Sequence, residues 1–145
     1  MDALRSTLEL MRGELSARRV EVRPADEWPG QAPTSLDPES LRQVYLNLLL
    51  NALEAMPEGG TLDVAVREAR GGTEVTFTDS GPGFPREVLR EIGQPFLTTK
   101  AQGTGLGLFL VRRLLEAAGG ALEIGNVPGS GARCTARFPR AGRSA

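Results

Sequence analysis

The sequence predicts a single domain in which helices and strands follow one another, and three observations lead to this prediction. The chain has 145 residues, a length typical of one domain with a proper hydrophobic core. Apolar residues recur at helical spacing in three stretches and alternate with polar residues in several shorter ones. Segments rich in glycine and proline separate them. We therefore expect one mixed domain over residues 1–140, and a disordered tail over residues 141–145.

Three main helices are predicted from apolar stripes and end signals. The first covers residues 3–17. The second begins after Asp37-Pro38, a helix cap followed by a first-turn proline, and ends near Met56. The third covers residues 105–118, and a short helix is expected near 86–92. The residues expected to face the core are Leu4, Leu8, Met11 and Leu15; Leu46, Leu49, Leu50 and Leu53; and Leu108, Val111 and Leu115, with Leu106, Leu110 and Leu114 beside them.

Five short strands are predicted where apolar and polar residues alternate. They cover residues 20–22, 62–66, 73–79, 121–125 and 132–138. The segment 24–33 is an irregular connector rich in proline. Residues 80–104 form a long loop interrupted by glycine and proline, and a loop of this length in a compact domain is usually functional or disordered.

The composition excludes several classes of function. The formal net charge of −1 gives no support for a nucleic-acid or membrane partner, and no apolar run approaches the roughly 20 residues that span a bilayer. The chain contains no histidine, which excludes the usual zinc sites, Ser-His triads and histidine general bases. Cys134 is the single cysteine and is expected to be a small core residue. With no signal-peptide core, these features favour the cytoplasm.

Three amides form a polar stripe on the second predicted helix. Gln43, Asn47 and Asn51 are spaced four residues apart and border its apolar face. Asparagine is a mediocre helix former, so two of them among leucines need a reason. One interpretation is a solvated edge or a helix cap, although Asn51 is far from either helix end. The other is that an amide oxygen binds Mg²⁺ together with phosphate oxygens and water.

A carboxylate ends one predicted strand on its apolar face. Asp79 shares that face with Val75 and Phe77, where an unpaired charge is costly. It is either a residue that caps the following turn, or an acceptor for the exocyclic amino group of adenine. The second role disfavours guanine, which presents a carbonyl oxygen at the same place. Gly81 and Gly83 then let the backbone approach the ring closely.

A glycine-rich segment leads into the third predicted helix. The sequence is Gly103-Thr104-Gly105-Leu106-Gly107-Leu108. Such a segment is either a flexible linker before a core helix, or a phosphate site at the positive end of the helix dipole.

These parts occur in an order that resembles the ATP-binding catalytic domain of two-component sensor histidine kinases, within the GHKL ATPase superfamily. The resemblance covers roughly residues 2–139 and rests on four ordered motifs. They are the N box at residues 43–56, the G1 box Asp79-Ser80-Gly81-Pro82-Gly83-Phe84, the F box Pro95-Phe96-Leu97-Thr98-Thr99-Lys100, and the G2 box at residues 103–108.

The resemblance implies a fold and a set of binding residues. The fold is a two-layer α/β sandwich, in which a mixed sheet of about five strands is backed by three helices. ATP lies between the helices and a lid. Asn51 is then a ligand of Mg²⁺, and Asn47 lies near the metal and phosphates. The resemblance also implies that Asp79, Gly81 and Gly83 contact adenine and that Phe96 anchors the lid. Thr99 and Lys100 then reach toward the phosphates. The backbone that surrounds the phosphates is that of Gly103, Thr104, Gly105, Leu106 and Gly107.

Asn47 indicates which reaction is expected. In hydrolysing relatives of the superfamily, a glutamate at this position activates water, whereas an amide cannot accept a proton at neutral pH. We therefore expect the γ-phosphoryl group to be kept for a protein acceptor, with Asn47 and Lys100 as catalytic residues. A chain without histidine holds no phosphorylatable histidine. The resemblance implies that this histidine lies on a dimerising helical hairpin outside this chain. The phosphoryl group then passes from the histidine to a response regulator receiver domain. This segment alone is expected to be a monomer.

Two positions depart from the family pattern, and three other functions stay open. Gly93 replaces a usual phenylalanine, and Ala132 lacks a hydroxyl that often serves the adenine-binding aspartate. A serine kinase of the anti-sigma-factor kind shares the nucleotide site. A signalling scaffold without catalysis keeps only the fold. A hydrolysing ATPase is disfavoured by Asn47.

Overall fold

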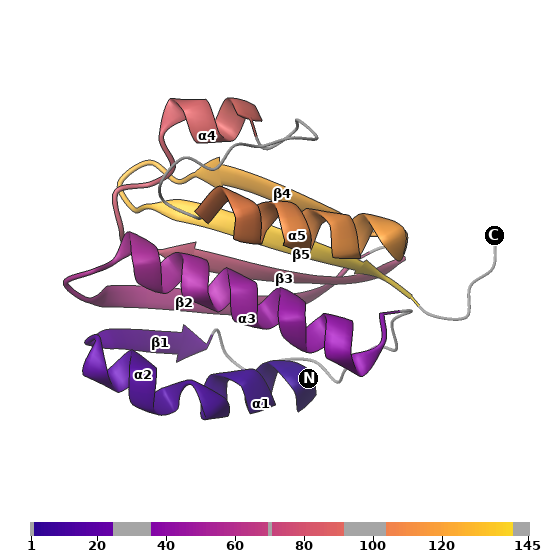
Figure 1. Cartoon of the computed structure of the whole chain (residues 1–145), viewed down its shortest axis with the longest axis horizontal. Helices are drawn as coiled ribbons and strands as arrows, with labels where there is room; N and C mark the ends of the chain where they lie inside the picture. The colour runs from indigo at the N-terminus through magenta and orange to yellow at the C-terminus, as the bar shows by residue number, and fades with distance from the viewer. Residues whose placement is uncertain (1, 25–35, 70, 92–103, 141–145) are drawn as a thin grey trace.

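The computed structural model describes residues 2–24, 36–69, 71–91 and 104–140, and Figure 1 shows the whole chain. The side chains of Asp2, Pro24, Ala69, Glu91 and residues 104–106 are not described. The helices are α1 (Asp2–Leu10), α2 (Arg12–Ala17), α3 (Pro38–Ala55), α4 (Arg86–Glu91) and α5 (Thr104–Ala117). The strands are β1 (Val20–Pro24), β2 (Gly60–Ala69), β3 (Gly72–Asp79), β4 (Ala121–Asn126) and β5 (Ala132–Pro139).

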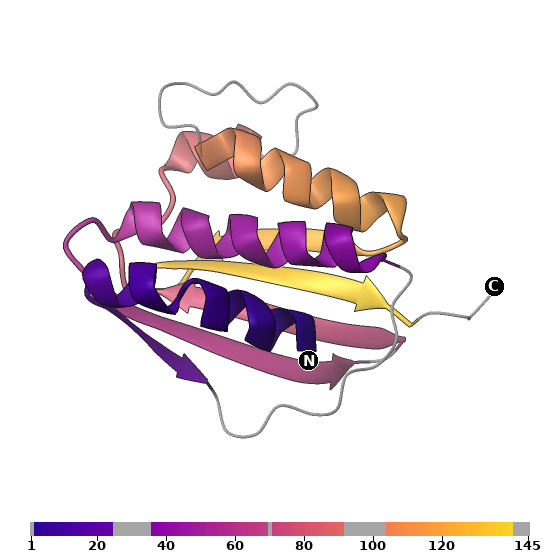
Figure 2. The same ribbon diagram turned by 60° about the horizontal axis from the view of Figure 1, so that its bottom comes forward.

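The five strands form one mixed sheet with the order β1-β2-β3-β5-β4. β1 pairs with β2 in parallel, and the other neighbours are antiparallel. Helices α1, α3 and α5 cover one face of the sheet, with α3 in the middle (Figures 1 and 2). The predicted two-layer sandwich is therefore confirmed.

Alternation along the strands places the core between the two layers. On β3, Val75 and Phe77 are buried, while Thr76 between them is half-exposed. Their partners across the ladders, Val66 and Val64 on β2, and Ala136 and Cys134 on β5, face the same side. This period of two is what the sequence predicted.

The central helix α3 begins at the predicted cap. An oxygen of the Asp37 carboxylate accepts a hydrogen bond from the Ser40 N–H at 3.1 Å, and Pro38 occupies the first turn. The cap satisfies one backbone donor that a helix start otherwise leaves unpaired.

The prediction of which face of α3 is buried was wrong in part. Leu49 and Leu53 are fully buried, but Leu46 is half-buried and Leu50 is 37% exposed. The face that packs on the sheet and the flanking helices instead comprises Leu41, Val44, Tyr45, Leu48, Leu49, Ala52 and Leu53. α3 contains leucine on several sides, so leucine spacing alone did not identify the stripe that the other elements cover.

The first and third helices differ from the prediction in smaller ways. The predicted helix at 3–17 is divided at Met11 into α1 and α2. The Thr7 hydroxyl donates back to the Ala3 carbonyl at 2.8 Å, a contact that bends helices, and Gly13 lowers helix propensity just after the break. In α5, Leu108, Val111 and Leu115 are fully buried as expected, but Leu110 is 39% exposed.

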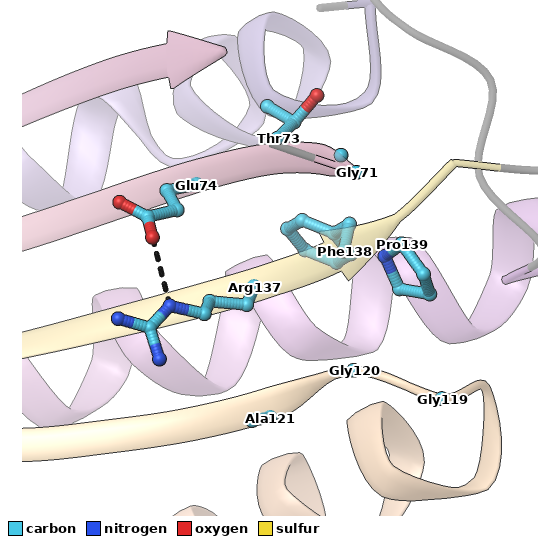
Figure 3. Close-up of a pocket in the computed structure, with 10 residues that line it drawn as sticks. Gly71, Thr73, Glu74, Gly119, Gly120, Ala121, Arg137, Phe138 and Pro139 are labelled. Atoms are coloured by element: carbon cyan, nitrogen blue, oxygen red, sulfur yellow. Dashed lines mark hydrogen bonds and ion pairs between the residues drawn. The ribbon is translucent and has the colours of Figure 1, made fainter. Parts of the chain in front are cut away.

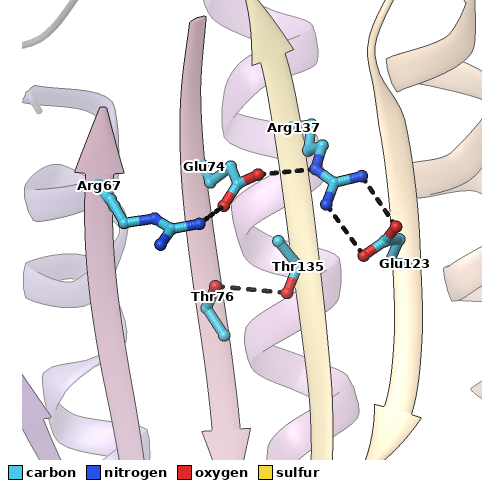
Figure 4. A network of polar contacts seen from close by, with 6 residues as sticks. All are labelled: Arg67, Glu74, Thr76, Glu123, Thr135 and Arg137. Atoms are coloured by element: carbon cyan, nitrogen blue, oxygen red, sulfur yellow. Dashed lines mark hydrogen bonds and ion pairs between the residues drawn. The ribbon is translucent and has the colours of Figure 1, made fainter. Parts of the chain in front are cut away.

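The opposite face of the sheet carries a chain of charged side chains. Glu74 accepts hydrogen bonds from Arg67 at 2.7 Å and Arg137 at 2.8 Å, and Arg137 also reaches both oxygens of Glu123 (Figure 4). The two arginines hold the pKa of Glu74 below its ordinary value. These groups pair across neighbouring strands, so they reinforce the register of β2, β3, β5 and β4 on the face opposite to α1, α3 and α5.

One buried polar atom is unpaired within the described part of the chain. Tyr45 is fully buried on α3, its ring packs edge-on against Phe138 at 5.8 Å, and its hydroxyl has no hydrogen-bond partner. Burial also raises the pKa of the phenol.

We predict that Tyr45→Phe leaves the free energy of unfolding unchanged or raises it by up to about 1 kcal/mol, because it removes an unpaired hydroxyl and keeps the ring contact. Denaturant titration of the two proteins measures this difference. Tyr45→Leu, which also loses the edge-on contact with Phe138, should be less stable than Tyr45→Phe. A loss above 1 kcal/mol in Tyr45→Phe would contradict the prediction.

Candidate functional site

Three of the predicted motifs meet at one end of the sandwich. They are the amide stripe of α3, the beginning of α5 and the carboxyl end of β3. α3 and α5 lie side by side across the sheet (Figure 2). A methyl group added at Gly107 on α5 would lie 3.4 Å from Oδ1 of Asn47. At the carboxyl end of β3, Gly81 lies against the Ala55 carbonyl at the end of α3.

The amide of Asn47 has a fixed orientation. Its Nδ2 donates to the backbone carbonyl of Gln43 at 2.9 Å, one turn earlier on α3. This bond occupies the donor end, and the carbonyl oxygen is the atom that approaches Gly107. Asn47 therefore offers an acceptor, and no general base, to the start of α5.

Asn51 lies one turn further along α3. It is 8% exposed, and its side-chain amide makes no hydrogen bond to the described residues. The helix cap is Asp37, so Asn51 has no capping role. Within the described residues, no protein group donates to the amide oxygen of Asn51, so this oxygen remains available to a ligand.

Asp79 is 3% exposed and lies on the helix-facing side of β3, as predicted. Its Oδ1 accepts the N–H of Gly81 at 2.9 Å and the N–H of Ala132 at 3.2 Å. The carboxylate thus does cap the following turn, but with one oxygen only. Within the described residues, Oδ2 receives no hydrogen bond. Burial raises the pKa of Asp79, and the two N–H donors oppose this shift in part.

Three glycines fit tightly around the turn that follows Asp79. A methyl group at Gly81 would lie 2.6 Å from the Ala55 carbonyl oxygen. Gly83 has a φ of +91°, in the left-handed region, and faces Oδ1 of Asn126. Gly131, at the start of β5, leaves no room for a side chain beside Asp79 and the Gly81 carbonyl. The protein itself therefore requires glycine at 81 and 83, whatever the ligand.

The glycine-rich segment is helical from Thr104 onward. The N–H groups of Thr104, Gly105 and Leu106 belong to the first turn of α5, where a helix leaves its donors without internal acceptors. Gly107 lies within the helix beside Asn47. The predicted site residues Phe96, Thr99, Lys100 and Gly103, and the departure at Gly93, lie outside the described residues.

The sequence interpretation missed three groups at the site. The Ala132 N–H holds Asp79, so the absence of a hydroxyl at this position does not leave the carboxylate without a donor. Gly131 makes the close approach of β5 possible. Asn126, at the end of β4, binds the backbone of Phe84 through both ends of its amide. The glycine before the last strand was a weak signal for the roles of Gly131 and Ala132. Nothing in the sequence pointed to Asn126.

Cys134 is a buried core residue, as expected, on the same face of the sheet as Asp79. Burial, together with the charge of Asp79, raises the pKa of its thiol to about 12. The thiol is therefore protonated at neutral pH and is not a nucleophile.

A shallow depression of about 470 Å³ lies at the opposite end of the sheet, where β3 and β4 begin and β5 ends (Figure 3). Glycines 71, 72, 119 and 120 border it, together with Arg137 and Phe138. It brings together none of the predicted site residues.

Residues 36–142 match the family model described as histidine kinase-, DNA gyrase B-, and HSP90-like ATPase. The chain belongs to this family. The match contains Asn47, Asn51, Asp79 and the start of α5. It confirms the superfamily that the four motifs predicted.

Two of the curated relatives carry the names of kinases. Over 135 residues, the chain is 37% identical to the sensor histidine kinase ZraS of Escherichia coli O157:H7, covering 92% of this chain and 29% of that protein. It is 42% identical over 104 residues to sporulation kinase A of Bacillus subtilis, covering 72% of this chain and 17% of that protein. The chain thus spans less than a third of the length of either relative.

Solved structures, a histidine kinase catalytic domain among them, have the same fold. The catalytic domain of histidine kinase ThkA aligns with a TM-score of 0.77 at 27% identity, over 96% of this chain and 91% of that one. Full-length ShkA in complex with AMPPNP aligns with a TM-score of 0.74 at 30% identity, over 97% of this chain and 30% of that one. Among the described residues, no helix is both long and apolar enough to cross a membrane.

We predict that Gly131→Ala lowers the free energy of unfolding by about 2–4 kcal/mol, because the methyl group overlaps backbone oxygens that cannot move aside. Chemical denaturation measures this loss. Gly125→Ala is the matched control, since its methyl group meets nothing within 4 Å and its φ is not positive. Equal stability of the two variants would contradict the prediction.

We also predict a pH-dependent stability difference for Asp79→Asn. The folded protein raises the pKa of Asp79, so its contribution to folding is most favourable below the unfolded pKa and declines as pH rises through the folded pKa. The asparagine keeps an acceptor for Gly81 and Ala132 but does not titrate. The variant should therefore gain stability relative to the parent protein between pH 3 and pH 7. Denaturation at several pH values tests this, and a gain that shrinks with rising pH would contradict it.

Proposed function

We propose that this chain binds Mg-ATP and donates its γ-phosphoryl group to a histidine on a separate segment, as the catalytic domain of a cytoplasmic sensor histidine kinase. The observation that carries the proposal is the position of Asn47 beside Gly107 in α5, with Asn51 one turn further along α3. Two amide oxygens on one helix and the N–H groups of a neighbouring helix start form a suitable site for a magnesium triphosphate.

The residues present fit a magnesium ion. Asn51 is nearly buried and has no hydrogen-bond partner in the described part of the chain, and Asn47 has its oxygen free while its nitrogen is held by Gln43. Amide oxygens are hard ligands that suit Mg²⁺ in company with phosphate and water. When bound, the ion would neutralise charge on the phosphate chain during phosphoryl transfer.

Asp79 is the proposed adenine residue. The N–H groups of Gly81 and Ala132 hold Oδ1, so that Oδ2 remains for a donor such as the exocyclic amino group. Guanine presents an acceptor there, and two acceptors facing each other in a site with little water are unfavourable. The site should therefore distinguish ATP from GTP. The solved ShkA complex holds the ATP analogue AMPPNP, which supports a nucleotide as the ligand.

Asn47 favours transfer over hydrolysis. Its nitrogen donates to Gln43, and an amide oxygen cannot remove a proton from water. The lid residues Thr99 and Lys100, with Phe96 and Gly103, complete the proposed phosphate site. The phosphoacceptor is a histidine on a dimerising helical hairpin outside this chain, and a response regulator aspartate receives the group next. Sensor kinase relatives support these partners.

Calorimetric titration with ATP and GTP, each with and without Mg²⁺, tests the proposal. Magnesium-dependent binding of ATP, absent for GTP and lost in Asn51→Ala and Asp79→Asn, supports it. No binding of ATP at millimolar concentration overturns it. Incubation with labelled ATP and a hairpin segment identifies the acceptor, since label on histidine is lost in acid and label on serine survives.

We predict that Gly107→Ala abolishes ATP binding while the domain stays as stable as before or gains about 0.5–1 kcal/mol. The methyl group is tolerated 3.4 Å from Asn47, and alanine is the better helix former, but it would occupy the approach of the phosphates. Gly13→Ala is the matched helical control, with nothing within 4 Å, and should bind ATP normally. Unchanged ATP affinity in Gly107→Ala would place the phosphates elsewhere.

A further inference from the structure

The turn that carries Asp79 is held by the hairpin between β4 and β5, and Asn126 is the side chain of that hairpin that binds the far end of the turn, at Phe84. The turn, from Asp79 to Phe84, leaves the end of β3 and leads toward α4. Asp79 is paired with Leu62 at the end of the β2–β3 ladder, and the Ser80 N–H donates to the Thr61 carbonyl at 3.1 Å. The hairpin between β4 and β5 contacts the turn at both ends, which makes the hairpin a structural part of the candidate site.

At its first end, the turn is held by the beginning of β5. The Ala132 N–H donates to Oδ1 of Asp79 at 3.2 Å. The Ser130 hydroxyl donates to the backbone carbonyl of Asp79 at 3.4 Å. Gly131 lies against the carbonyl of Gly81. These contacts fix the carboxylate relative to β5.

At its second end, the turn is held by Asn126 on β4. Oδ1 of Asn126 accepts the Phe84 N–H at 2.8 Å, and Nδ2 donates to the Phe84 carbonyl at 3.1 Å. One amide thus binds both backbone groups of one residue, as a neighbouring strand would. Phe84 is also 9% exposed and packed in the core, so side chain and backbone are both fixed.

The fit between Asn126 and Gly83 shows how closely the clamp is built. A methyl group at Gly83 would lie 2.9 Å from Oδ1 of Asn126, and the φ of +91° carries the chain from the turn directly onto the clamp. Across the hairpin, Asn126 pairs with Ala132, the residue whose N–H holds Asp79. Both ends of the turn are therefore tied to the same pair of residues on β4 and β5.

We propose that Asn126 is a positioning residue for nucleotide binding: it clamps Phe84 and so keeps the turn from Asp79 to Gly83 in its ligand-ready shape. The inference rests on the proposed ATP site and adds to it a residue outside the four motifs. Preorganisation of the turn lowers the ordering cost when ligand binds. Loss of the clamp therefore weakens ATP binding although Asn126 touches no ligand.

The experiment measures ATP affinity by calorimetry and the hydrogen exchange of the Phe84 amide in the nucleotide-free protein, for the parent protein, Asn126→Ala and Leu122→Ala. Leu122 lies on the same strand, packs against the core and makes no contact with the turn in the bonds described, so it controls for general loss of stability. We expect Asn126→Ala to raise the Kd for ATP at least tenfold and to speed exchange at Phe84 by a similar factor. Leu122→Ala should change neither by more than about twofold.

The outcomes separate this inference from the proposed function. If the parent protein binds ATP and Asn126→Ala binds it within twofold of the same Kd, the positioning role is overturned and the proposed function stands. If Leu122→Ala weakens ATP binding as much as Asn126→Ala, the effect is one of stability and the positioning role is again overturned. If the parent protein does not bind ATP, the proposed function fails, and the exchange at Phe84 still shows whether Asn126 clamps the turn.

Discussion

The packing of α3 is the constraint on which the rest of the structure depends. One face of this helix lies on the sheet, and its two flanks meet α1 and α5. Tyr45, Leu49 and Leu53 are fully buried in that packing. The same helix carries Asn47, which lies beside Gly107 of α5, and Asn51 one turn further along, so the core and the candidate ligand site share one element. A change in the rotation of α3 would move both at once, because the apolar face and the amide stripe are fixed relative to each other by the helical repeat.

Most of the fold could be predicted from local patterns, because each strand alternates and each helix begins or ends at a recognisable residue. The Asp37 cap and the five strands are examples. The errors arose where several faces of one helix are apolar. Leu50 and Leu110 have the chemistry of core residues and lie exposed, since no element in the described part of the chain covers that side of α3 or α5. The strand order and the parallel pairing of β1 with β2 join distant segments, and only the family resemblance gave a guide to them.

The candidate site was predictable where a polar side chain interrupts an apolar pattern. Asn51 and Asp79 stood out for that reason, and both are nearly buried in the structure. The groups that hold Asp79 could not be found in this way. One is a backbone N–H, at Ala132, that any residue except proline could supply, and it comes from 53 positions further along the chain. Asn126 lies at a strand end before a Pro-Gly turn, where asparagine is ordinary.

The sheet order also has a consequence for the path of folding. β2 with β3, and β4 with β5, are neighbours in sequence and can pair as local hairpins, whereas the pairing of β3 with β5 joins residues as far apart in sequence as Gly72 and Pro139. Closing so long a segment carries a large entropic barrier, so it comes late relative to the hairpins. The carboxylate of Asp79 meets its donor on β5 only at that step. The Asp79 end of the candidate site is therefore assembled by the docking of two preformed hairpins and does not exist in either one alone.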